Sequence, residues 1–468
     1  MRNGTGDGDT IVARATPRGA SALSVTRLSG PESFTIAASV FEGTDLRDQA
    51  SHTAHVGYIR GNRGPIDQVV VTLFKGPNSS TGEDVIEITC HGGDVATDAV
   101  ITLLVERGAR HAEPGEYTLR SFMNGKVDLA QAEGIAELIH ARSARAGRIS
   151  MAHIRGKYSE ELSAIRSDLM ELLSMVELEL DFGEEDVAFA DKGRLASLLD
   201  SADERLGLLR NSFRLGRAIA DGVRVVIVGK PNAGKSTLLN AIVGYDRVIV
   251  SATPGTTRDE VESEVEYGGV RYQFVDTAGL RETEDHIEAE GVRRSLQAIQ
   301  GADLMIELVD LTEIVSREKN LSDRGRPGES ESDPDVGDAP RLRIGNKTDL
   351  LNDIGASGAG YDLVLSAHDI ADDPEGLASL MNAIAERTVG SEALNEEHHV
   401  VTSQRQRAHV LAALEAVTRA RHTLESGGSG DMLSSDVREI VDEIGAITGE
   451  ITNEDILDQI FSRFCIGK

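Results

Sequence analysis

Apolar and polar positions alternate in different ways along this chain of 468 residues. Up to about residue 124, short runs rich in β-branched residues are separated by glycine-rich turns, which predicts a small α/β domain. The clearest of these runs are residues 11–13, 68–74 and 85–89. We therefore expect an N-terminal domain that spans residues 1–124.

Helical spacing replaces this pattern from about residue 126 to residue 215. Apolar side chains there recur at intervals of three and four residues, which predicts one face of a long amphipathic helix. The residues that carry this spacing are Leu162, Ile165, Leu169, Leu172 and Val176. Helical spacing returns at 405–424 and 437–444. A single helical domain of residues 125–217 and 385–468, interrupted by an inserted module, is more economical than two separate helical domains.

The inserted module spans residues 218–384. Between 316 and 340 it contains a stretch rich in Ser, Asp, Glu, Gly and Pro with no periodicity, which predicts a disordered surface loop. The predicted fold class is therefore multidomain, with an α/β N-terminal domain, a discontinuous α-helical domain and an inserted α/β domain.

A glycine-rich turn at residues 229–237 gives the strongest chemical signal. The β-branched run Val223–Val228 predicts a strand before it, and residues 238–242 predict a helix after it. This arrangement aims backbone N–H groups and the positive end of the helix dipole at a polyphosphate. Lys235 is then expected to reach the β- and γ-phosphates, and the Ser236 hydroxyl to hold Mg²⁺. The predicted phosphate-binding residues are Asn232, Ala233, Gly234, Lys235, Ser236 and Thr237.

Further motifs identify the nucleotide base. Asp276-Thr277-Ala278-Gly279 follows a strand-like run, where a carboxylate can reach the metal and a glycine N–H can face a γ-phosphate. Asn346-Lys347-Thr348-Asp349 follows another such run, where the Asp349 carboxylate can accept hydrogen bonds from the ring N–H and the exocyclic amine of guanine. Ser366-Ala367 completes the guanine site after a third run. The order of these motifs predicts that the module binds GTP.

Composition limits the setting in which the chain works. The 78 acidic and 48 basic residues give a net charge of −30, which argues either against non-specific nucleic-acid binding or for a high-salt cytoplasm where acidic surfaces stay hydrated. The absence of Trp and the heavy use of Asp and Glu favour the high-salt explanation. With only Cys90 and Cys465, a disulfide framework is not expected. No apolar run reaches the length of a membrane span, and the polar residues 1–9 do not resemble a signal peptide. We expect a cytoplasmic protein with no membrane partner.

Other signatures resemble a known family. They are residues 114–118 (Pro-Gly-Glu-Tyr-Thr), 124–133 (Asn-Gly-Lys-Val-Asp-Leu-Ala-Gln-Ala-Glu), 255–259 (Gly-Thr-Thr-Arg-Asp) and 464–468 (Phe-Cys-Ile-Gly-Lys). Together they resemble the MnmE (TrmE) family, the tRNA wobble-uridine modification GTPases of bacteria and mitochondria. The resemblance runs from Asp9 to the last residue, apart from the loop at 316–340. It implies an N-terminal tetrahydrofolate-binding domain that dimerises, a discontinuous helical domain and an inserted Ras-like P-loop G domain.

The same resemblance implies the reaction and the partners. The family forms a homodimer and acts with an FAD-dependent flavoprotein of the MnmG (GidA) type, in a heterotetramer or larger complex. Together they install an aminomethyl or carboxymethylaminomethyl group on the wobble uridine of tRNA and take the one-carbon unit from a folate. The implied cofactors are Mg²⁺, K⁺ and a tetrahydrofolate derivative in the 5-formyl or methylene form, and GTP is the substrate that is hydrolysed.

Hydrolysis of GTP needs a group that orients water and a cation that offsets the developing phosphate charge. The position of the Ras-like glutamine is Leu280, which cannot orient water. The resemblance implies Glu288 as the catalytic carboxylate and Thr257 as the residue that closes on Mg²⁺. The implied nucleotide-binding loop consists of Ser251, Ala252, Thr253, Pro254, Gly255, Thr256 and Thr257. The implied K⁺ ligands are Asn232, Ser251, Thr253 and Thr256.

Simpler interpretations of these residues stay open. Glu288 can be one solvated charge among many charged neighbours. Arg258 is a rival electrophile, although its neighbour Asp259 favours a structural ion pair. The hydroxyls of Thr256 and Thr257 can merely cap a turn.

The folate site depends on the resemblance, which maps it to Arg27, Glu87, Lys126 and Lys468. A pterin offers an amide and amine edge to a carboxylate, and the glutamyl tail of a folate needs cations. The resemblance also places Cys465 beside the folate, as a residue needed for modification but not for GTP hydrolysis. The alternatives are an ordinary strand carboxylate at Glu87, a helix-start charge at Lys126 and a buried structural Cys465.

A second class of function stays open, namely a GTPase that binds the ribosome or assembling RNA. Only the modification enzyme needs both the folate residues and the Cys465 tail. A helical scaffold with an inactive G domain is a poorer explanation, because Lys235, Asp276 and Asp349 are intact. Asp310, which follows another strand-like run, is interpreted as a strand-end cap rather than a ligand.

Overall fold

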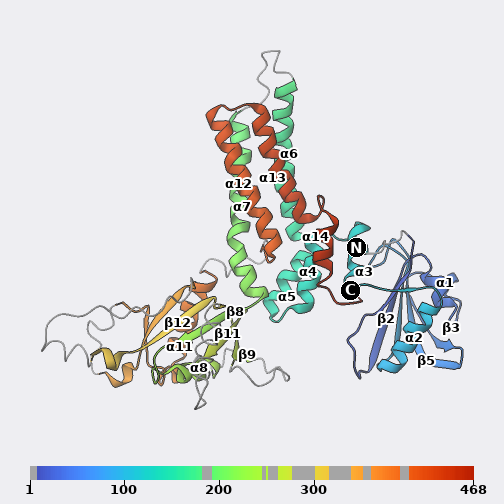
Figure 1. The fold of residues 1–468 in the computed structure, drawn as a ribbon, viewed down its shortest axis with the longest axis horizontal. Coiled ribbons are helices and arrows are strands. Elements are labelled where there is room, and N and C mark those ends of the chain that lie inside the picture. The colour runs from blue at the N-terminus through green and yellow to red at the C-terminus, as the bar shows by residue number, and fades with distance from the viewer. Residues whose placement is uncertain are drawn as a thin grey trace, which may run out of the picture. The chain divides into compact units, whose positions relative to one another are not determined.

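The computed structural model describes residues 8–181, 192–244, 249–250, 262–276, 301–315, 339–351, 360–390 and 400–467. The chain divides into two compact units (Figure 1). The first comprises Met1–Ala136, His153–Ser167 and Val441–Lys468, and the second comprises Glu137–Ala152 and Asp168–Ile440. This division does not test the domain boundaries expected from the sequence, which stay predictions.

A mixed sheet forms the body of the first unit. Its strands run in the order β3-β4-β5-β6-β2-β1-β7. Neighbouring strands are antiparallel, except for β1 and β7, which are parallel. The strand bounds are Ile11–Arg14 (β1), Leu23–Ser29 (β2), Phe41–Glu42 (β3), Thr53–Gly61 (β4), Gly64–Phe74 (β5), Val85–His91 (β6) and Arg110–His111 (β7). The three β-rich runs of the sequence lie in β1, β5 and β6, as predicted.

Helices α1 (Ser33–Ala38) and α2 (Asp94–Glu106) pack their apolar side chains onto one face of this sheet (Figure 1). Because side chains alternate along a strand, Leu28 enters the core under these helices, whereas its neighbour Arg27 points to the opposite face. One face of the sheet is therefore covered by α1 and α2, and the opposite face carries charged side chains such as Arg27.

The last helix of the chain also belongs to the first unit. The helices α3 (Glu116–Met123) and α14 (Glu454–Phe461) are in contact. Leu129, at the start of α4 (Leu129–His140), joins them in an apolar cluster. The rings of Phe461 and Phe464 lie 5.4 Å apart in the same cluster, between their centroids. These contacts fix the C-terminal segment beside α3.

Long helices lie side by side in Figure 1. Their bounds are Lys157–Asp181 (α6), Lys192–Ala220 (α7), Gln404–Ser426 (α12) and Gly430–Thr448 (α13), and the shorter α5 spans Ala144–Ile154. Ion pairs connect them, with Arg205 of α7 lying 3.1 Å from Asp168 of α6 and Arg421 of α12 lying 2.7 Å from Asp200 of α7. The five apolar residues that predicted a long helix all lie buried in α6. None of the helices in the described ranges combines the length and the apolar character that a membrane span requires.

A second sheet forms the inserted module, in the order β14-β13-β12-β8-β11-β10-β9. The pairs β14–β13, β13–β12, β12–β8 and β8–β11 are parallel. The pairs β11–β10 and β10–β9 are antiparallel. The strand bounds are Val223–Val228 (β8), Ile249–Val250 (β9), Glu262–Tyr267 (β10), Val270–Asp276 (β11), Leu304–Asp310 (β12), Arg341–Asn346 (β13) and Leu363–Val364 (β14). The helices α8 (Lys235–Val243) and α11 (Pro374–Thr388) pack on this sheet.

The parallel strands bring the nucleotide motifs to one edge of the sheet. Asp276 of β11 pairs with Ile227 of β8, and Asp310 of β12 pairs with Asn346 of β13. The carboxyl ends of these parallel strands therefore lie along one edge of the sheet, where α/β sheets bind ligands. Strand β12 continues to Asp310, beyond Glu307, which pairs with Val228 at the end of β8.

Candidate functional site

The turn between β8 and α8 forms a phosphate-binding loop. Gly234 has a φ of +99°, and a methyl group there would lie 2.3 Å from the side-chain nitrogen of Asn346, so this position requires glycine. Lys235 is only 6% exposed, and its Nζ donates hydrogen bonds to the carbonyls of Gly229 (3.0 Å) and Lys230 (2.9 Å). The loop thus holds an ammonium group where a phosphate is expected.

Asn346 joins this loop to the rest of the predicted guanine site. Its Nδ2 donates to the carbonyl of Ala233 at 2.7 Å, and its Oδ1 accepts from the N–H of Ala367 at 2.8 Å. Asn346, Ser366 and Ala367 are all buried. The structure therefore brings the phosphate loop, Asn346 and the pair Ser366–Ala367 together. Their role in binding GTP stays a prediction.

Four other polar residues of the predicted nucleotide site are exposed to solvent. Asn232, with a φ of +63°, and the first-turn residues Ser236 and Thr237 are exposed, and so is Asp349. A hydroxyl oxygen at Ser236 suits Mg²⁺, and an amide oxygen at Asn232 suits K⁺, because both cations prefer oxygen ligands. The two described ligands, Ser236 and Asn232, therefore fit the implied ions.

Several of the predicted site residues lie outside the described residues. Asp276 is described as the end of β11, but its side chain is not. The others are Ser251, Ala252, Thr253, Pro254, Gly255, Thr256, Thr257, Thr277, Ala278, Gly279, Glu288 and Lys468. Their assignments stay predictions.

Asp310 makes an ion pair that sequence reasoning missed. Its Oδ1 accepts from the N–H (2.9 Å) and the hydroxyl (2.6 Å) of Thr312, which confirms the predicted strand-end cap. Its Oδ2 lies 2.6 Å from the Nζ of Lys347. Burial acts to raise the pKa of Asp310, but the hydrogen bonds from Lys347 and Thr312 outweigh it and hold the pKa below its ordinary value. The position of Asp310 at a strand end was the only signal in the sequence.

Two predicted folate residues form an ion pair on the face of the N-terminal sheet opposite to α1 and α2, where Tyr117 of α3 packs. Arg27 and Glu87 lie opposite each other on β2 and β6, and Nε and Nη2 of Arg27 donate to Oε1 of Glu87 at 2.9 and 2.6 Å. The hydroxyl of Tyr117 donates to the carbonyl of Arg27 at 2.6 Å, and its ring centroid lies 5.7 Å from the guanidinium carbon. Both charged side chains are partly exposed, so a ligand can reach the pair.

The C-terminal segment lies at the same end of this sheet. The carbonyl of Cys465 accepts a hydrogen bond from the N–H of Gly115 at 3.5 Å. A methyl group on Gly467, whose φ is +95°, would lie 2.2 Å from the carbonyl oxygen of Arg14 at the end of β1. Cys465 is exposed, so the alternative of a buried structural thiol is wrong.

Lys126 lies next to a loop on the same face. Its side chain is exposed, and a methyl group on Gly82 would lie 3.4 Å from its Cγ. The hydroxyl of Thr81, in the same loop, lies 2.7 Å from the hydroxyl of Ser29, two residues along β2 from the ion pair. The structure therefore places Lys126 beside the loop that contacts β2 at Ser29.

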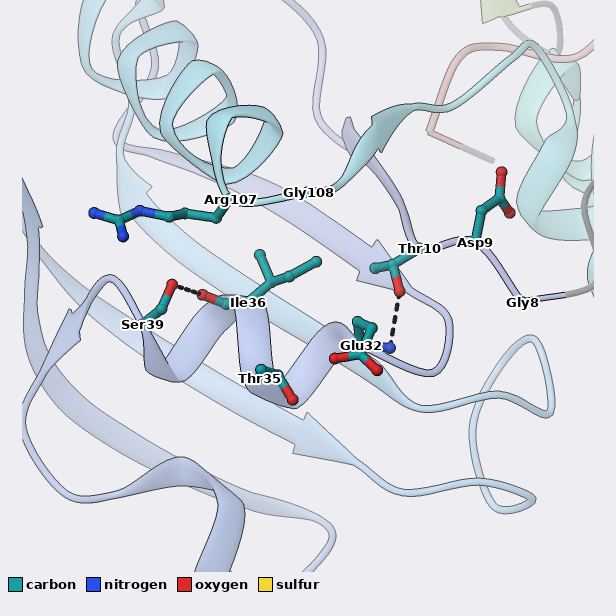
Figure 2. A pocket seen from close by; sticks show the side chains of 9 residues that line it. All are labelled: Gly8, Asp9, Thr10, Glu32, Thr35, Ile36, Ser39, Arg107 and Gly108. Atoms are coloured by element: carbon teal, nitrogen blue, oxygen red, sulfur yellow. Dashed lines mark hydrogen bonds between the residues drawn. The ribbon is translucent and has the colours of Figure 1, made fainter.

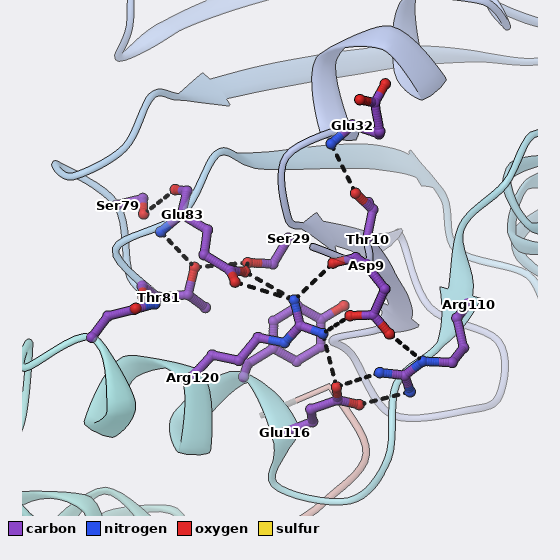
Figure 3. A network of polar contacts seen from close by, with 12 residues as sticks. Asp9, Thr10, Ser29, Glu32, Ser79, Thr81, Glu83, Arg110, Glu116 and Arg120 are labelled. Atoms are coloured by element: carbon purple, nitrogen blue, oxygen red, sulfur yellow. Dashed lines mark hydrogen bonds and ion pairs between the residues drawn. The ribbon is translucent and has the colours of Figure 1, made fainter. Parts of the chain in front are cut away.

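A network of charged side chains around the buried Glu116 orders this region (Figure 3). Glu116, which is 2% exposed, lies 2.6 Å from Arg110 and 3.0 Å from Arg120, and both arginines also bind Asp9. Arg120 further reaches Glu83 at 3.1 Å. Burial acts to raise the pKa of Glu116, but the hydrogen bonds that it accepts outweigh burial and lower the pKa. Sequence reasoning used Glu116 only as part of a signature and missed this network.

Neutralising Glu116 is expected to lower the free energy of unfolding by about 3 kcal/mol, because a broken buried pair leaves charges uncompensated. The folded pKa lies below the ordinary value of 4.5, so the stabilisation is present above that pH and is lost as the pH falls through the folded pKa. Urea unfolding of Glu116→Gln and of the exposed control Glu106→Gln measures this effect. Equal unfolding midpoints for the two variants at pH 7 would contradict it.

A separate hollow of about 290 Å³ lies on the helix-covered side of the N-terminal sheet (Figure 2). It is lined by Gly8, Asp9, Thr10, Glu32, Thr35, Ile36, Ser39, Arg107 and Gly108. The charged side chains of Glu32 and Arg107 are exposed, and the hydroxyl of Thr10 already accepts from the N–H of Glu32 at 2.9 Å. We assign no ligand to this hollow.

Comparison with known proteins identifies the family. Two family models match, the GTP-binding protein TrmE N-terminus at residues 10–126 and the MnmE helical domain at residues 129–465. The tRNA modification GTPase MnmE of Salinibacter ruber is 50% identical over 468 residues, which cover 98% of this chain and 99% of the relative. The protein of the same name from Cytophaga hutchinsonii is 42% identical over 461 residues, covering 98% of each chain.

Among solved structures, the FeoB G-domain from Methanococcus jannaschii matches 36% of this chain and 97% of its own length, at 25% identity and a TM-score of 0.22. The assignment depends instead on the full-length relatives. They confirm the predicted fold class, with a TrmE-type α/β N-terminal domain, a discontinuous helical domain and an inserted P-loop G domain. This chain therefore belongs to the MnmE family of tRNA modification GTPases.

Proposed function

We propose that this chain hydrolyses GTP in a K⁺-dependent reaction and modifies the wobble uridine of tRNA together with an FAD-dependent protein of the MnmG (GidA) type. The product is 5-carboxymethylaminomethyluridine or its aminomethyl relative, and the one-carbon unit comes from a tetrahydrofolate derivative. One observation carries this proposal: the same chain holds a phosphate loop built around Lys235 and an accessible Arg27–Glu87 pair near the Cys465 segment. A GTPase that serves ribosome or RNA assembly needs only the first of these.

In hydrolysis, the residues of the G domain supply position and charge. Lys235 neutralises the β- and γ-phosphate oxygens, and Glu288 orients the attacking water. Ser236 and Thr257 would hold Mg²⁺. Asn232, Ser251, Thr253 and Thr256 would hold K⁺, and this second cation would offset the charge that develops on the phosphates during hydrolysis.

In modification, the residues of the N-terminal sheet bind and orient the folate, which supplies the one-carbon unit when bound. The Glu87 carboxylate accepts hydrogen bonds from the amide and amine edge of the pterin. Arg27, Lys126 and Lys468 provide cations for the acidic tail. The exposed Cys465 thiol, the fourth residue from the end of the chain, works on this side of the protein rather than in the G domain.

An apolar area on the face of the N-terminal sheet opposite to α1 and α2 supports a homodimer. Val56 and Val70 lie opposite each other on β4 and β5, and they are 67% and 39% exposed. Tyr58 and Leu23, on the same face, are 45% and 59% exposed. An exposed apolar area beside charged residues is typical of a protein interface, and a second copy of the chain is the occupant that we propose.

The reducing cytoplasm is the compartment that suits the free thiols of Cys90 and Cys465.

K⁺ dependence is tested by comparing GTP hydrolysis in KCl and NaCl at equal ionic strength. The rate of hydrolysis in K⁺ is expected to be well over twice the rate in Na⁺. The increase should be smaller than the roughly 10³–10⁵-fold acceleration that an arginine finger provides. Equal steady-state rates in the two salts would remove the K⁺ assignment and favour Arg258 as the electrophile.

Folate binding is tested with Arg27→Met, which leaves the Glu87 carboxylate without its cation. The affinity for 5-formyltetrahydrofolate, measured by calorimetry, is expected to fall about 10- to 100-fold, because a hydrogen bond to a charged group is lost. Arg18→Met is the matched control, because Arg18 lies in the same domain, is 74% exposed and pairs only loosely with Asp98 at 3.4 Å. Equal affinities of the two variants would show that the pair does not bind the folate.

A further inference from the structure

The ion pair between Asp310 and Lys347 has no part in the roles assigned above. Asp310 is the last residue of β12 and lies in register with Asn346, the last residue of β13. Lys347 is the next residue, and it begins the turn that carries Asp349. The Asp310 carboxylate therefore lies beside the end of β13, from which the chain continues to Asp349, the residue predicted to bind the guanine base.

Hydrogen bonds from Thr312 fix the Asp310 carboxylate independently of its ion pair with Lys347. Thr312 donates to Oδ1 through both its N–H and its hydroxyl, at 2.9 and 2.6 Å, and Oδ2 lies 2.6 Å from the Nζ of Lys347. The side chains of Asp310 and Lys347 are 11% and 26% exposed. A partly desolvated pair with one fixed partner restrains its surroundings more than a flexible surface ion pair does.

The turn after β13 needs such a restraint. Lys347 has a φ of +69°, a left-handed conformation that residues other than glycine adopt at a cost. Asn346 is fixed on one side by its bonds to Ala233 and Ala367. Asp349, two residues beyond Lys347, is exposed. The ion pair is thus a side-chain link between the end of β12 and this turn.

We propose that Asp310 is a positioning residue for recognition of the guanine base. It holds Lys347, and with it the left-handed turn, so that the Asp349 carboxylate stays aligned with the base edge. This inference rests on the proposed base-reading role of Asp349. It deepens that role, because it proposes that a residue of the neighbouring strand β12 sets the orientation of Asp349.

Asp310→Asn in the full chain tests the inference, because it keeps the size of the side chain and removes its charge. The Kd values for GTP and GDP are expected to rise by the same factor, about tenfold, since the two nucleotides share the guanine. Discrimination against inosine triphosphate, which lacks the exocyclic amine, should fall, while kcat at saturating GTP stays within about twofold of wild type. A merely structural role would lower thermal stability without changing the ratio of the two triphosphate affinities.

Asp303→Asn is the matched control, because Asp303 lies just before the other end of β12. It likewise accepts a backbone N–H, from Arg224 at 2.9 Å, and lies 3.6 Å from Arg217. This variant should leave the discrimination unchanged. Should Asp310→Asn fail to fold, Thr312→Val removes one donor to the carboxylate and should shift the discrimination in the same direction by a smaller factor.

Unchanged affinity and discrimination in Asp310→Asn, or in Thr312→Val if the first variant does not fold, would overturn the inference. Asp349→Asn separates this outcome from an error in the base site, because it should weaken GTP binding and admit xanthosine triphosphate. If Asp349→Asn behaves in that way while Asp310→Asn resembles wild type, only the positioning role is wrong. If Asp349→Asn also resembles wild type, the base site itself is misplaced.

Discussion

Replacing Lys235 by alanine is expected to lower kcat/KM for GTP by about 10²–10³-fold, since it removes a preorganised charge from the phosphate site. The ammonium group is buried and bonded to the carbonyls of Gly229 and Lys230, so its charge is fixed in the loop before a nucleotide binds. Release of inorganic phosphate by the purified full chain, with GTP varied at saturating Mg²⁺, measures the effect.

Lys230→Ala is the matched control for this prediction, because the two lysines belong to the same loop. Lys230 is 66% exposed, and its Nζ lies 3.5 Å from Glu313, as in a weak surface ion pair. GTP turnover by Lys230→Ala should stay within about twofold of wild type. Similar losses in the two variants would mean that any change to the loop impairs turnover, and the specific role of Lys235 would be wrong.

Replacing Cys465 by serine is expected to leave GTP hydrolysis near the wild-type rate and to abolish modification of the wobble uridine. The side chain is exposed, and the adjacent Phe464 supplies the packing that holds the segment, so the change of one atom does not disturb the fold. Cys465 also lies in the first unit, whereas the phosphate loop lies in the second. Turnover assays on the purified protein and nucleoside mass spectrometry of cellular tRNA give the two readouts.

The exposed Ser462→Ala, three residues away, is the control and should behave as wild type in both assays. Fully modified tRNA in cells that carry Cys465→Ser would show that the thiol has no chemical role. Loss of both activities would place Cys465 in the folding or assembly of the chain, and the separation of the two functions would fail.

Local patterns sufficed to predict the elements that carry the nucleotide motifs. The apolar run of β8 and the glycine at position 234 act over a few residues, because burial on both faces and a left-handed turn each dictate residue types at fixed positions. The spacing of Leu162 and its partners likewise specified the buried face of α6. Each of these sequence patterns can be recognised from a few neighbouring residues.

The polar contacts within the sites could not be predicted from the sequence alone. Arg27 and Glu87 are 60 residues apart, and only the register of β2 and β6 sets them opposite each other. Asp310 and Lys347 are 37 residues apart and meet because two parallel strands end at the same level. Family resemblance named the first pair as folate residues but gave no sign that they bind each other. Register is a property of the whole sheet, so no local pattern reveals it.

The central claim is that hydrolysis of GTP by this chain drives modification of the tRNA wobble uridine. Its most direct test is mass spectrometry of wobble nucleosides from a strain in which the gene is deleted and then restored as wild type or as Lys235→Ala. We predict that the deletion strain lacks 5-carboxymethylaminomethyluridine and its aminomethyl relative, that the wild-type gene restores them and that Lys235→Ala does not. Unchanged wobble nucleosides in the deletion strain, or full restoration by Lys235→Ala, would contradict the claim.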